Sequence, residues 1–191
     1  MKKIAILGSG SGSNMQSIAD AINHGSLDAE IVYIGCDIEG AYIFERAQSL
    51  NLPCSLIDCQ GYKSKFPKES QTALALHLKS LGVDLICLAG FMRLVGAPLL
   101  EHFPNRILNI HPSLLPAYPG LHAWEQAISD GATESGCTVH YVDAGMDTGE
   151  IIQQARVPVL PDDSPTSLHQ RIQIEERSLY PAVVKQVLAS L

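Results

Sequence analysis

Continuous apolar runs alternate along the chain with segments of helical periodicity. Apolar runs of four to seven residues, which are typical of buried strands, lie at residues 3–8, 30–36, 54–58, 84–90 and 106–110. Apolar positions spaced three or four residues apart, which are typical of amphipathic helices, fall at residues 15–25, 41–50, 68–82 and 122–131. This alternation predicts βαβ units, whose strands form a mainly parallel sheet with helices on its faces.

The pattern changes in the last third of the chain. Residues 136–143 and 150–159 are both strand-like, and the six residues between them are too few for a helix, so they should pair antiparallel. Ser164, as an N-cap, and Pro165, at the first helical position, predict a long final helix. The sequence therefore predicts an α/β fold with a doubly wound, mainly parallel seven-stranded sheet and an antiparallel end. Because no repeat or linker interrupts the pattern, we expect a single domain over residues 1–191.

Composition and charge narrow the functional classes. Apolar residues make up 46% of the chain and charged residues 17%, which allows a substantial core. No apolar run reaches the roughly 18 residues of a membrane span, and the run at residues 4–7 is shorter than the about 7–15 residues of a signal peptide core. We therefore expect a cytoplasmic protein without membrane contact, and reduced core thiols for its five cysteines. A net charge of −7 argues against nucleic acid as a partner, so an anionic substrate would need local donors.

The glycine-rich segment "GSGSGSN" (8–14) joins the first predicted strand to the first predicted helix. Unpaired N–H groups at a helix N-terminus favour an anion, which makes Gly12, Ser13 and Asn14 candidates for phosphate binding. The lysine of a Walker loop is absent, and the third glycine of a dinucleotide fingerprint is missing. Asp37, at the end of the second strand, could still bind a ribose, so NAD binding remains an alternative. A purely structural turn is a further alternative for this segment.

The segment "LNIHPSLLPAYPG" (108–120) places Asn109 and His111 at the carboxyl end of a predicted strand. Side chains two apart share one face of an extended chain, and Pro112 restricts His111 to an extended conformation. An Asn amide can donate to an oxygen that gains negative charge, and a His can move protons near neutral pH. These residues predict an active site at the edge of the sheet.

Asp147, in the loop "DAGMDTG" (143–149), is a candidate partner that would orient His111 and raise its pKa. Asp147, Thr148 and Gly149 could also form only a turn. A metal site formed by Asp147 with several histidines is an alternative without specific ligand spacing, so no metal is expected. The remaining histidines, His169 among them, receive no role, and we expect Trp124 to be a packing residue.

Four segments together resemble the phosphoribosylglycinamide formyltransferase (glycinamide ribonucleotide transformylase) family of folate-dependent enzymes. They are "GSGSGSN" (8–14), "AGFMRLV" (89–95), "NIHPSLLPAYPG" (109–120) and "VDAGMDTGEII" (142–152), and the resemblance extends from residue 3 to about residue 181. It implies a Rossmann-like formyltransferase fold with a phosphate-binding half at about residues 1–100 and a folate-binding, catalytic half at about residues 84–191. It also implies formyl transfer from 10-formyltetrahydrofolate to the amine of glycinamide ribonucleotide, in purine biosynthesis.

The resemblance implies a role for each matched residue. The catalytic residues would be Asn109, His111 and Asp147. The ribonucleotide would be bound by Gly12, Ser13, Asn14 and Glu176, although the register could favour the adjacent Glu175. Folate would be bound by Met92, Arg93, Leu94, Val95, Asn109 and Lys65. At Lys65 family members often carry Arg, and Lys lacks the bidentate fork of Arg. We expect Arg93 to supply positive potential for the anionic substrates. A monomer or a homodimer would fit.

Three other functions are possible, and each would require sequence features that differ from those of this chain. A formyltetrahydrofolate hydrolase would share the catalytic residues, but such proteins usually carry an N-terminal regulatory domain, for which we expect no room before the strand at Lys3. Methionyl-tRNA formyltransferase usually adds a C-terminal RNA-binding domain and a basic surface, which an acidic chain ending in its last helix does not favour. A nucleotide-binding regulatory protein would need no set of proton-handling residues.

Overall fold

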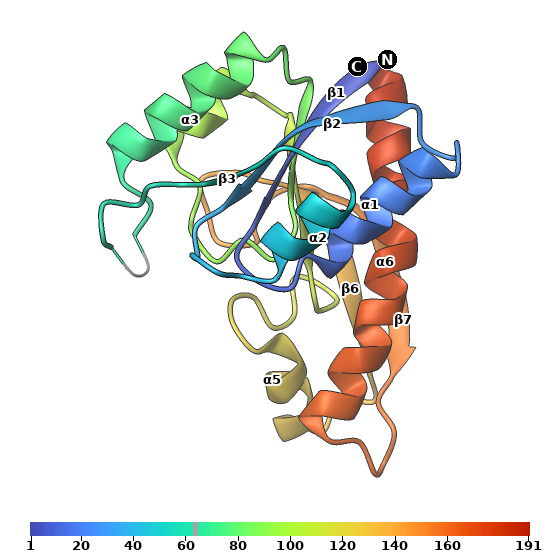
Figure 1. Ribbon diagram of the computed structural model, residues 1–191. Helices are drawn as coiled ribbons and strands as arrows, with labels where there is room; N and C mark the ends of the chain where they lie inside the picture. Colours follow the sequence, from blue (N-terminus) through green and yellow to red (C-terminus); the bar gives the residue numbers. More distant parts are fainter. Residues whose placement is uncertain (63–64) are drawn as a thin grey trace.

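Seven strands form one sheet in the computed structural model, which describes residues 1–62 and 65–191. The order across the sheet is β3-β2-β1-β4-β5-β6-β7 (Figure 1). The strands are β1 (Lys2–Gly8), β2 (Ala29–Cys36), β3 (Cys54–Leu56), β4 (Leu85–Leu88), β5 (Ile107–His111), β6 (Glu134–Tyr141) and β7 (Ile151–Pro158). The predicted α/β fold class with a seven-stranded, mainly parallel sheet is confirmed.

The strand pairing creates a switch point next to β1. Strand β1 pairs in parallel with both β2 and β4, β2 pairs in parallel with β3, and β4 with β5. The chain thus builds the sheet outward from β1 in one direction and then returns to build it in the other. Strand β6 is antiparallel to both β5 and β7, which confirms the predicted antiparallel end. Ligands in such sheets bind beyond the carboxyl ends of the strands at the switch point.

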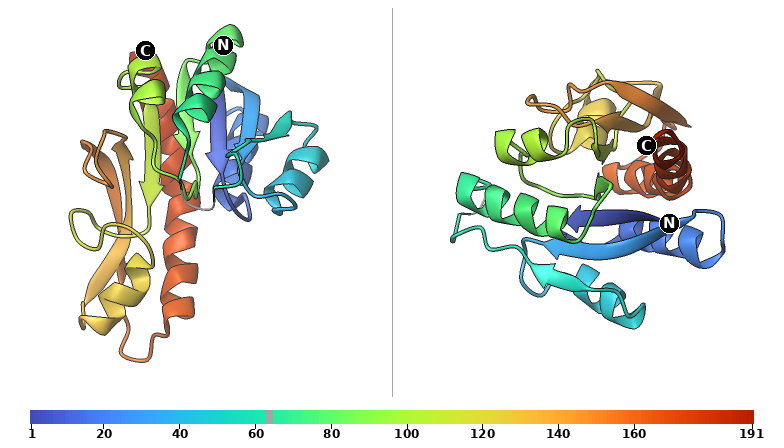
Figure 2. Two further views of the ribbon diagram at one scale, coloured as in Figure 1. Left: turned by 90° about the vertical axis from the view of Figure 1, so that its left-hand side faces the viewer. Right: turned by 90° about the horizontal axis from the view of Figure 1, so that it is seen from above.

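Helices cover both faces of the sheet (Figure 2). The helices α1 (Ser13–Asn23), α2 (Ile43–Ser49), α5 (Ala123–Ser129) and α6 (Pro165–Ser190) pack on one face, and α3 (Lys68–Ser80) and α4 (Ala97–His102) on the other. The sequence pattern did not predict α4, because six residues give too few turns for a periodic signal. Its start after Gly96, with Pro98 in the first turn, is the signal that could have identified it.

The long helix α6 is anchored directly to the strands that lead into the candidate site. Its predicted N-cap is confirmed, since the Ser164 hydroxyl accepts a hydrogen bond from the backbone N–H of Ser167 at 3.2 Å. The fully buried Tyr180 hydroxyl lies 2.9 Å from the carbonyl oxygen of Leu88 and 3.2 Å from that of Leu108. Because β4 ends at Leu88 and Leu108 directly precedes Asn109 on β5, this contact fixes α6 beside the end of β4 and the part of β5 that leads into Asn109.

All five cysteines are free thiols, as expected, and four of them are buried. Within the described residues, no helix combines the length and the apolar character needed to cross a membrane.

Candidate active site

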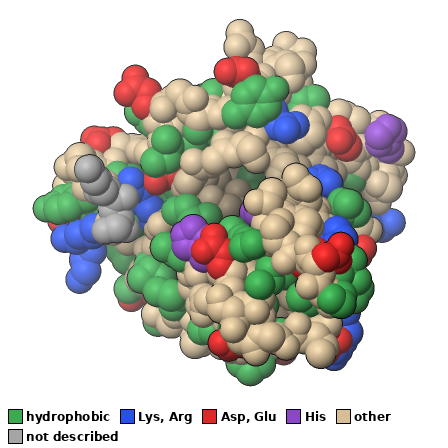
Figure 3. Space-filling model, turned by 90° about the horizontal axis from the view of Figure 1, so that it is seen from below, with side chains coloured by type: hydrophobic (Ala, Val, Ile, Leu, Met, Phe, Trp, Pro, Cys, Tyr) green, Lys and Arg blue, Asp and Glu red, His purple; other side chains and the backbone are tan. Residues whose placement is uncertain are grey.

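A cavity of about 620 Å³ lies beyond the carboxyl ends of β1, β4 and β5. It is lined by residues 10–14, 88–95, 109–112 and 120–122, by parts of 142–147, and by Trp124, His140, His169, Gln173 and Glu176. Figure 3 shows a face of the molecule that is hollowed near its centre. The cavity therefore brings together the glycine-rich segment, the predicted folate-binding segment and the predicted catalytic residues.

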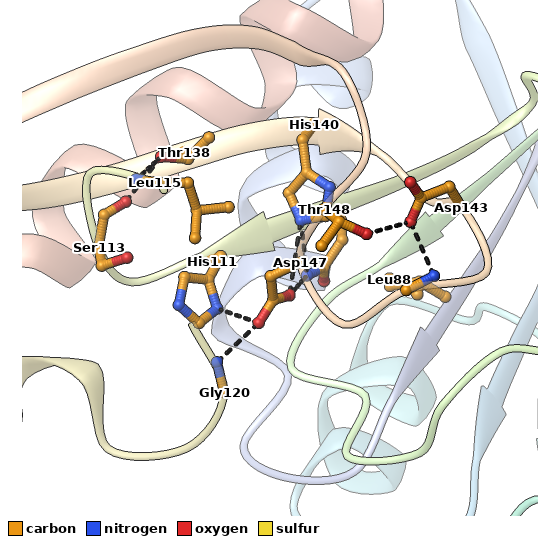
Figure 4. Close-up of polar contacts among 12 residues, drawn as sticks. Leu88, His111, Ser113, Leu115, Gly120, Thr138, His140, Asp143, Asp147 and Thr148 are labelled. Atoms are coloured by element: carbon orange, nitrogen blue, oxygen red, sulfur yellow. Dashed lines mark hydrogen bonds and ion pairs between the residues drawn. The ribbon is translucent and has the colours of Figure 1, made fainter. Parts of the chain in front are cut away.

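Asn109, His111 and Asp147 all line this cavity and lie close together, and Figure 4 shows the His111 ring facing the Asp147 carboxylate. His111 Nδ1 lies 3.4 Å from Asp147 Oδ2, and Asn109 Nδ2 lies 3.4 Å from Asp147 Oδ1. The backbone N–H of Gly120 donates to Asp147 Oδ2 at 2.8 Å. Strand β5 thus carries the amide and the imidazole, and the loop after β6 brings the carboxylate to both.

His111 is buried, and both of its ring nitrogens face acceptors. Nε2 donates to the carbonyl oxygen of Tyr118 at 2.9 Å, while Nδ1 faces the carboxylate of Asp147. Burial nevertheless lowers the pKa of His111, because it outweighs the opposing effects of the Tyr118 carbonyl and the Asp147 charge. Asp147 thus acts on the pKa of His111 in the expected direction, but the loss of solvent is the larger effect and lowers the pKa overall.

Asp147 remains ionised despite its partial burial. Burial acts to raise the pKa of its carboxyl, but the His140 ring, the Gly120 N–H and the His111 ring together lower it below its usual value. Asp147 also has a φ of 55°, in the left-handed region where Asp and Asn are tolerated better than most residues. Asp147 thus combines a turn conformation with a position in the cavity.

His140 is a member of this cluster that the sequence did not reveal. Its Nδ1 donates to the carbonyl oxygen of Tyr141 at 2.7 Å, and its Nε2 lies 3.3 Å from Asn109 Nδ2 and 3.7 Å from Asp147 Oδ1. His140 is paired directly opposite Asn109 in the antiparallel register of β5 and β6. The pairing register of β5 and β6 is the signal that would have identified His140, and local sequence patterns do not give this register.

The glycine-rich segment presents a helix N-terminus to the cavity. Gly12 is the N-cap of α1, with a φ of 73°, and the first turn of the helix contains no acidic residue. On α6, Glu176 lines the cavity and accepts a hydrogen bond from Asn14 Nδ2 at 3.1 Å, whereas Glu175 does not line it. Of the two adjacent acids, the structure therefore brings Glu176 to the site.

We expect Gly12→Val to weaken binding of a phosphate-bearing substrate by about tenfold, because the left-handed backbone is strained by a side chain. An added Cβ would also lie 2.8 Å from Ile43 Cγ1, which would displace the loop. Titration calorimetry with the ribonucleotide measures the effect. Gly25→Val is the matched control, since Gly25 has a φ of 72° with open space around its Cβ position. Unchanged affinity in Gly12→Val would show that the phosphate binds elsewhere.

Burial raises the pKa of Glu176 to about 7, against the opposing effects of Asn14 and Arg177. The unfolded chain releases this proton at lower pH, so the group destabilises the fold progressively as pH rises from about 4.5 to 7. We expect Glu176→Gln to increase the free energy of unfolding at pH 8, on the order of 3 kcal/mol, and by much less at pH 5.5. Urea denaturation at both pH values measures this. Glu175→Gln is the control, and an equal effect of both substitutions would contradict the assignment.

Arg93 does not provide the free positive charge that the sequence suggested. Its guanidinium is buried, and Nε lies 2.5 Å from Asp37 Oδ2. Arg93 also donates to the carbonyl oxygens of Tyr62 and Lys65, and Ser9 donates to the other oxygen of Asp37. The charge of Arg93 is thus neutralised by Asp37. Its guanidinium joins its own segment to Asp37 and to the carbonyl groups of Tyr62 and Lys65. Asp37 is equally committed to this pair, which leaves it unavailable for a dinucleotide ribose.

The other predicted folate-binding residues divide between the cavity and the surface. Met92 and Leu94 line the cavity with exposed side chains, and Val95 lines it from a buried position. Lys65 is exposed and is not among the residues that line the cavity; its Nζ lies 5.0 Å from the centre of the Tyr62 ring. A folate contact by Lys65 stays a prediction.

Three further aromatic side chains line the cavity near the start of α6. The rings of Trp124 and His169 are stacked, with centroids 3.6 Å apart and planes inclined by 4°. His122 approaches Trp124 edge-on and lies 3.2 Å from Glu125. Trp124 is therefore a stacking partner as well as a packing residue. In the described part of the chain, no three His, Cys, Asp or Glu side chains are grouped as metal ligands would be.

Comparison with known proteins identifies the class to which this fold and site belong. Residues 2–184 match the formyl transferase family, so the chain belongs to that family. It is 42% identical to phosphoribosylglycinamide formyltransferase of Bacillus subtilis (strain 168) over 188 residues, which cover 98% of this chain and 95% of that protein.

A second relative and a solved structure extend the comparison. The chain is 46% identical to the trifunctional purine biosynthetic protein adenosine-3 of Drosophila pseudoobscura pseudoobscura, but spans only 13% of the length of that protein. The crystal structure of glycinamide ribonucleotide transformylase 1 from Symbiobacterium toebii matches with a TM-score of 0.92 and 47% identity, covering 97% of this chain and 86% of that one.

Proposed function

We propose that this protein transfers the formyl group of 10-formyltetrahydrofolate to the amine of N1-(5-phosphoribosyl)glycinamide, a step of de novo purine (IMP) biosynthesis. The observation that carries the proposal is the cluster of Asn109, His111 and Asp147 inside a cavity, between a helix N-terminus suited to phosphate and an apolar segment suited to folate. The family match and the relatives named above support the same activity.

The two ends of the cavity suit the two substrates. The N-terminus of α1 at Gly12 and Ser13 favours the phosphate of the ribonucleotide, and the ionised form of Glu176 can accept from ribose hydroxyls. Met92 and Leu94 offer exposed apolar surface to an aromatic folate, while backbone groups of the same segment supply polar contacts. The formyl group would then lie between them, over Asn109.

Asn109 can stabilise the charge that develops when the amine attacks the formyl carbon. As the new C–N bond forms, the formyl oxygen gains negative charge, and Asn109 Nδ2 is the neutral donor nearest the catalytic pair. A preorganised donor of this kind is worth about a hundredfold to a thousandfold in rate.

The reaction also requires a proton to leave the amine and to reach N10 of the folate as the old C–N bond breaks. The lowered pKa of His111 leaves the imidazole neutral near pH 7, so it can receive the proton. Asp147 then faces an imidazolium at 3.4 Å and stabilises it. The Asp147–His111 pair thus holds the proton between the two steps, and no net proton is gained or lost.

The decisive assay separates this transferase from formyltetrahydrofolate hydrolase, which the comparisons do not support. Purified protein should consume 10-formyltetrahydrofolate only when the ribonucleotide is present, and formylated ribonucleotide should accumulate in equal amount. Consumption at the same rate in its absence would identify water as the acceptor. Mass spectrometry of the products distinguishes the outcomes.

A further inference from the structure

The loop that carries Asp147 has little support from the core. It joins β6 to β7, and the N–H of Tyr141 donates to the carbonyl oxygen of Glu150 at its base, at 2.9 Å. Residues 143–146 are exposed, and the loop contains two glycines, whose backbones lose more conformational freedom on ordering than those of other residues. The φ of 55° at Asp147 adds a local cost. A further contact must therefore hold the loop in this conformation.

Most contacts of the Asp147 carboxylate are too long to fix its position by themselves. Its oxygens lie 3.4 Å from His111 Nδ1, 3.4 Å from Asn109 Nδ2 and 3.7 Å from His140 Nε2. Charge-assisted hydrogen bonds are usually about 2.7–2.9 Å long. Of the contacts described above, the one with the N–H of Gly120 has this length, 2.8 Å, and Gly120 is itself in the loop between β5 and α5. The internal contacts of the loop therefore contribute to where the carboxylate lies.

Asp143 and Thr148 close the loop around Asp147 (Figure 4). Asp143 Oδ1 accepts one hydrogen bond from the Thr148 hydroxyl at 2.7 Å and another from the N–H of Gly145 at 3.0 Å. The chain is tightly folded at this point, because a Cβ added at Gly145 would lie 2.0 Å from Thr148 Oγ1. These three residues form a clasp that restrains the backbone on both sides of Asp147.

We propose that Asp143 and Thr148 are positioning residues, which hold the Asp147 carboxylate against His111 before the substrates bind. This inference rests on the proposed function, since it concerns how the proposed catalytic pair is arranged. Thr148 is not among the described residues that line the cavity, so its effect on the reaction is transmitted through Asp147. A carboxylate that is already in place needs no rearrangement during proton transfer, and this preorganisation increases the rate.

We expect Thr148→Val, which keeps the branched shape and removes the hydroxyl, to lower kcat about tenfold, with KM for both substrates within about twofold. Thr148→Ser keeps the hydroxyl and should retain kcat within about twofold of wild type. Gly145→Ala should also lower kcat, because its Cβ displaces the Thr148 hydroxyl. Thr72→Val is the matched control, since it removes a hydroxyl that donates to the Lys68 carbonyl on α3, outside the cavity. Unchanged kcat in both Thr148→Val and Gly145→Ala would overturn the proposal.

A double-mutant cycle shows whether Thr148 acts through Asp147. Thr148→Val should lower kcat about tenfold in the wild-type background but less than about twofold in the Asp147→Asn background, where the carboxylate is already absent. Thermal unfolding verifies that every variant is folded at the assay temperature. An equal loss in both backgrounds would mean that Thr148 affects the reaction independently of Asp147, and it would overturn the proposal.

The protonation of His111 provides a readout that requires no turnover. Burial and the His140 ring lower the pKa of His111, whereas the Tyr118 carbonyl and the Asp147 charge raise it. If the clasp holds the carboxylate in place, Thr148→Val should lower the pKa of His111 further, and Thr148→Ser should not. NMR titration of the histidine rings in the full chain measures this. An unchanged pKa of His111 in Thr148→Val would overturn this inference alone, whereas absence of ribonucleotide-dependent formyl transfer by the wild type would contradict the proposed function.

Discussion

Asp147→Asn is expected to lower kcat by about a thousandfold while changing the dissociation constants of both substrates by less than about threefold. The substitution keeps the size of the side chain and suits the left-handed backbone at this position, so the fold should persist. It removes the charge that lies 3.4 Å from His111 Nδ1. Stopped-flow and steady-state assays of formyl transfer, together with calorimetry for each substrate, measure the two effects separately.

The pH profile adds a second readout for the same substitution. Without the Asp147 charge, the pKa of His111 should fall further below its usual value, because burial remains and its opposing charge is gone. The acidic limb of kcat/KM should therefore move to lower pH. Asp162→Asn, at an exposed acid, is the control for a lost carboxylate. Turnover within tenfold of wild type in Asp147→Asn would remove Asp147 from the proposed mechanism.

Asn109→Ala is expected to lower kcat by about a hundredfold to a thousandfold, with smaller changes in KM, because the lost donor acts on charge that exists only in the transition state. In the free protein Asn109 Nδ2 lies between Asp147 Oδ1 and His140 Nε2, at 3.4 and 3.3 Å, so the amide is already oriented. Rapid-quench measurement of single-turnover rates at saturating substrates tests the chemical step directly.

Two comparisons control this second experiment. Asn23→Ala, at the exposed end of α1, removes an amide far from the cavity and should leave the single-turnover rate unchanged. Thermal unfolding should show that Asn109→Ala remains folded at the assay temperature. A rise in KM that accounts for the whole loss of kcat/KM would instead make Asn109 a ground-state binding residue.

Several features followed from the sequence because they depend on short-range patterns. The apolar runs gave the strands to within a few residues, since a strand buried on both faces requires a continuous apolar segment. The proximity of Asn109 and His111 followed from the two-residue period of an extended chain. The position of Gly12 in the turn between β1 and α1 followed from the glycine-rich run, and its φ of 73° is a conformation that glycine adopts readily.

The charge state of the cavity could not be derived from such patterns. The sequence suggested that Arg93 was a free cation, but the fold places Asp37, directly after β2 and 56 residues earlier in the chain, against its guanidinium. Likewise, the effect of Asp147 on the pKa of His111 was expected in the right direction, but the burial that outweighs it was not, because burial is a property of the packed structure.

The sequence by itself determined the order along the chain of the seven strands and of every helix except α4, the reversal of direction at the end of the sheet, and the residue types available at its edge. Only the tertiary structure decided which of those residues meet. The β5–β6 register brought His140 to Asn109, the loop after β6 brought Asp147 to His111, and the packing of α6 on α5 stacked His169 on Trp124. The physical reason is that local propensities act over a few residues, whereas contacts between distant segments depend on strand register, burial and the packing of the whole core.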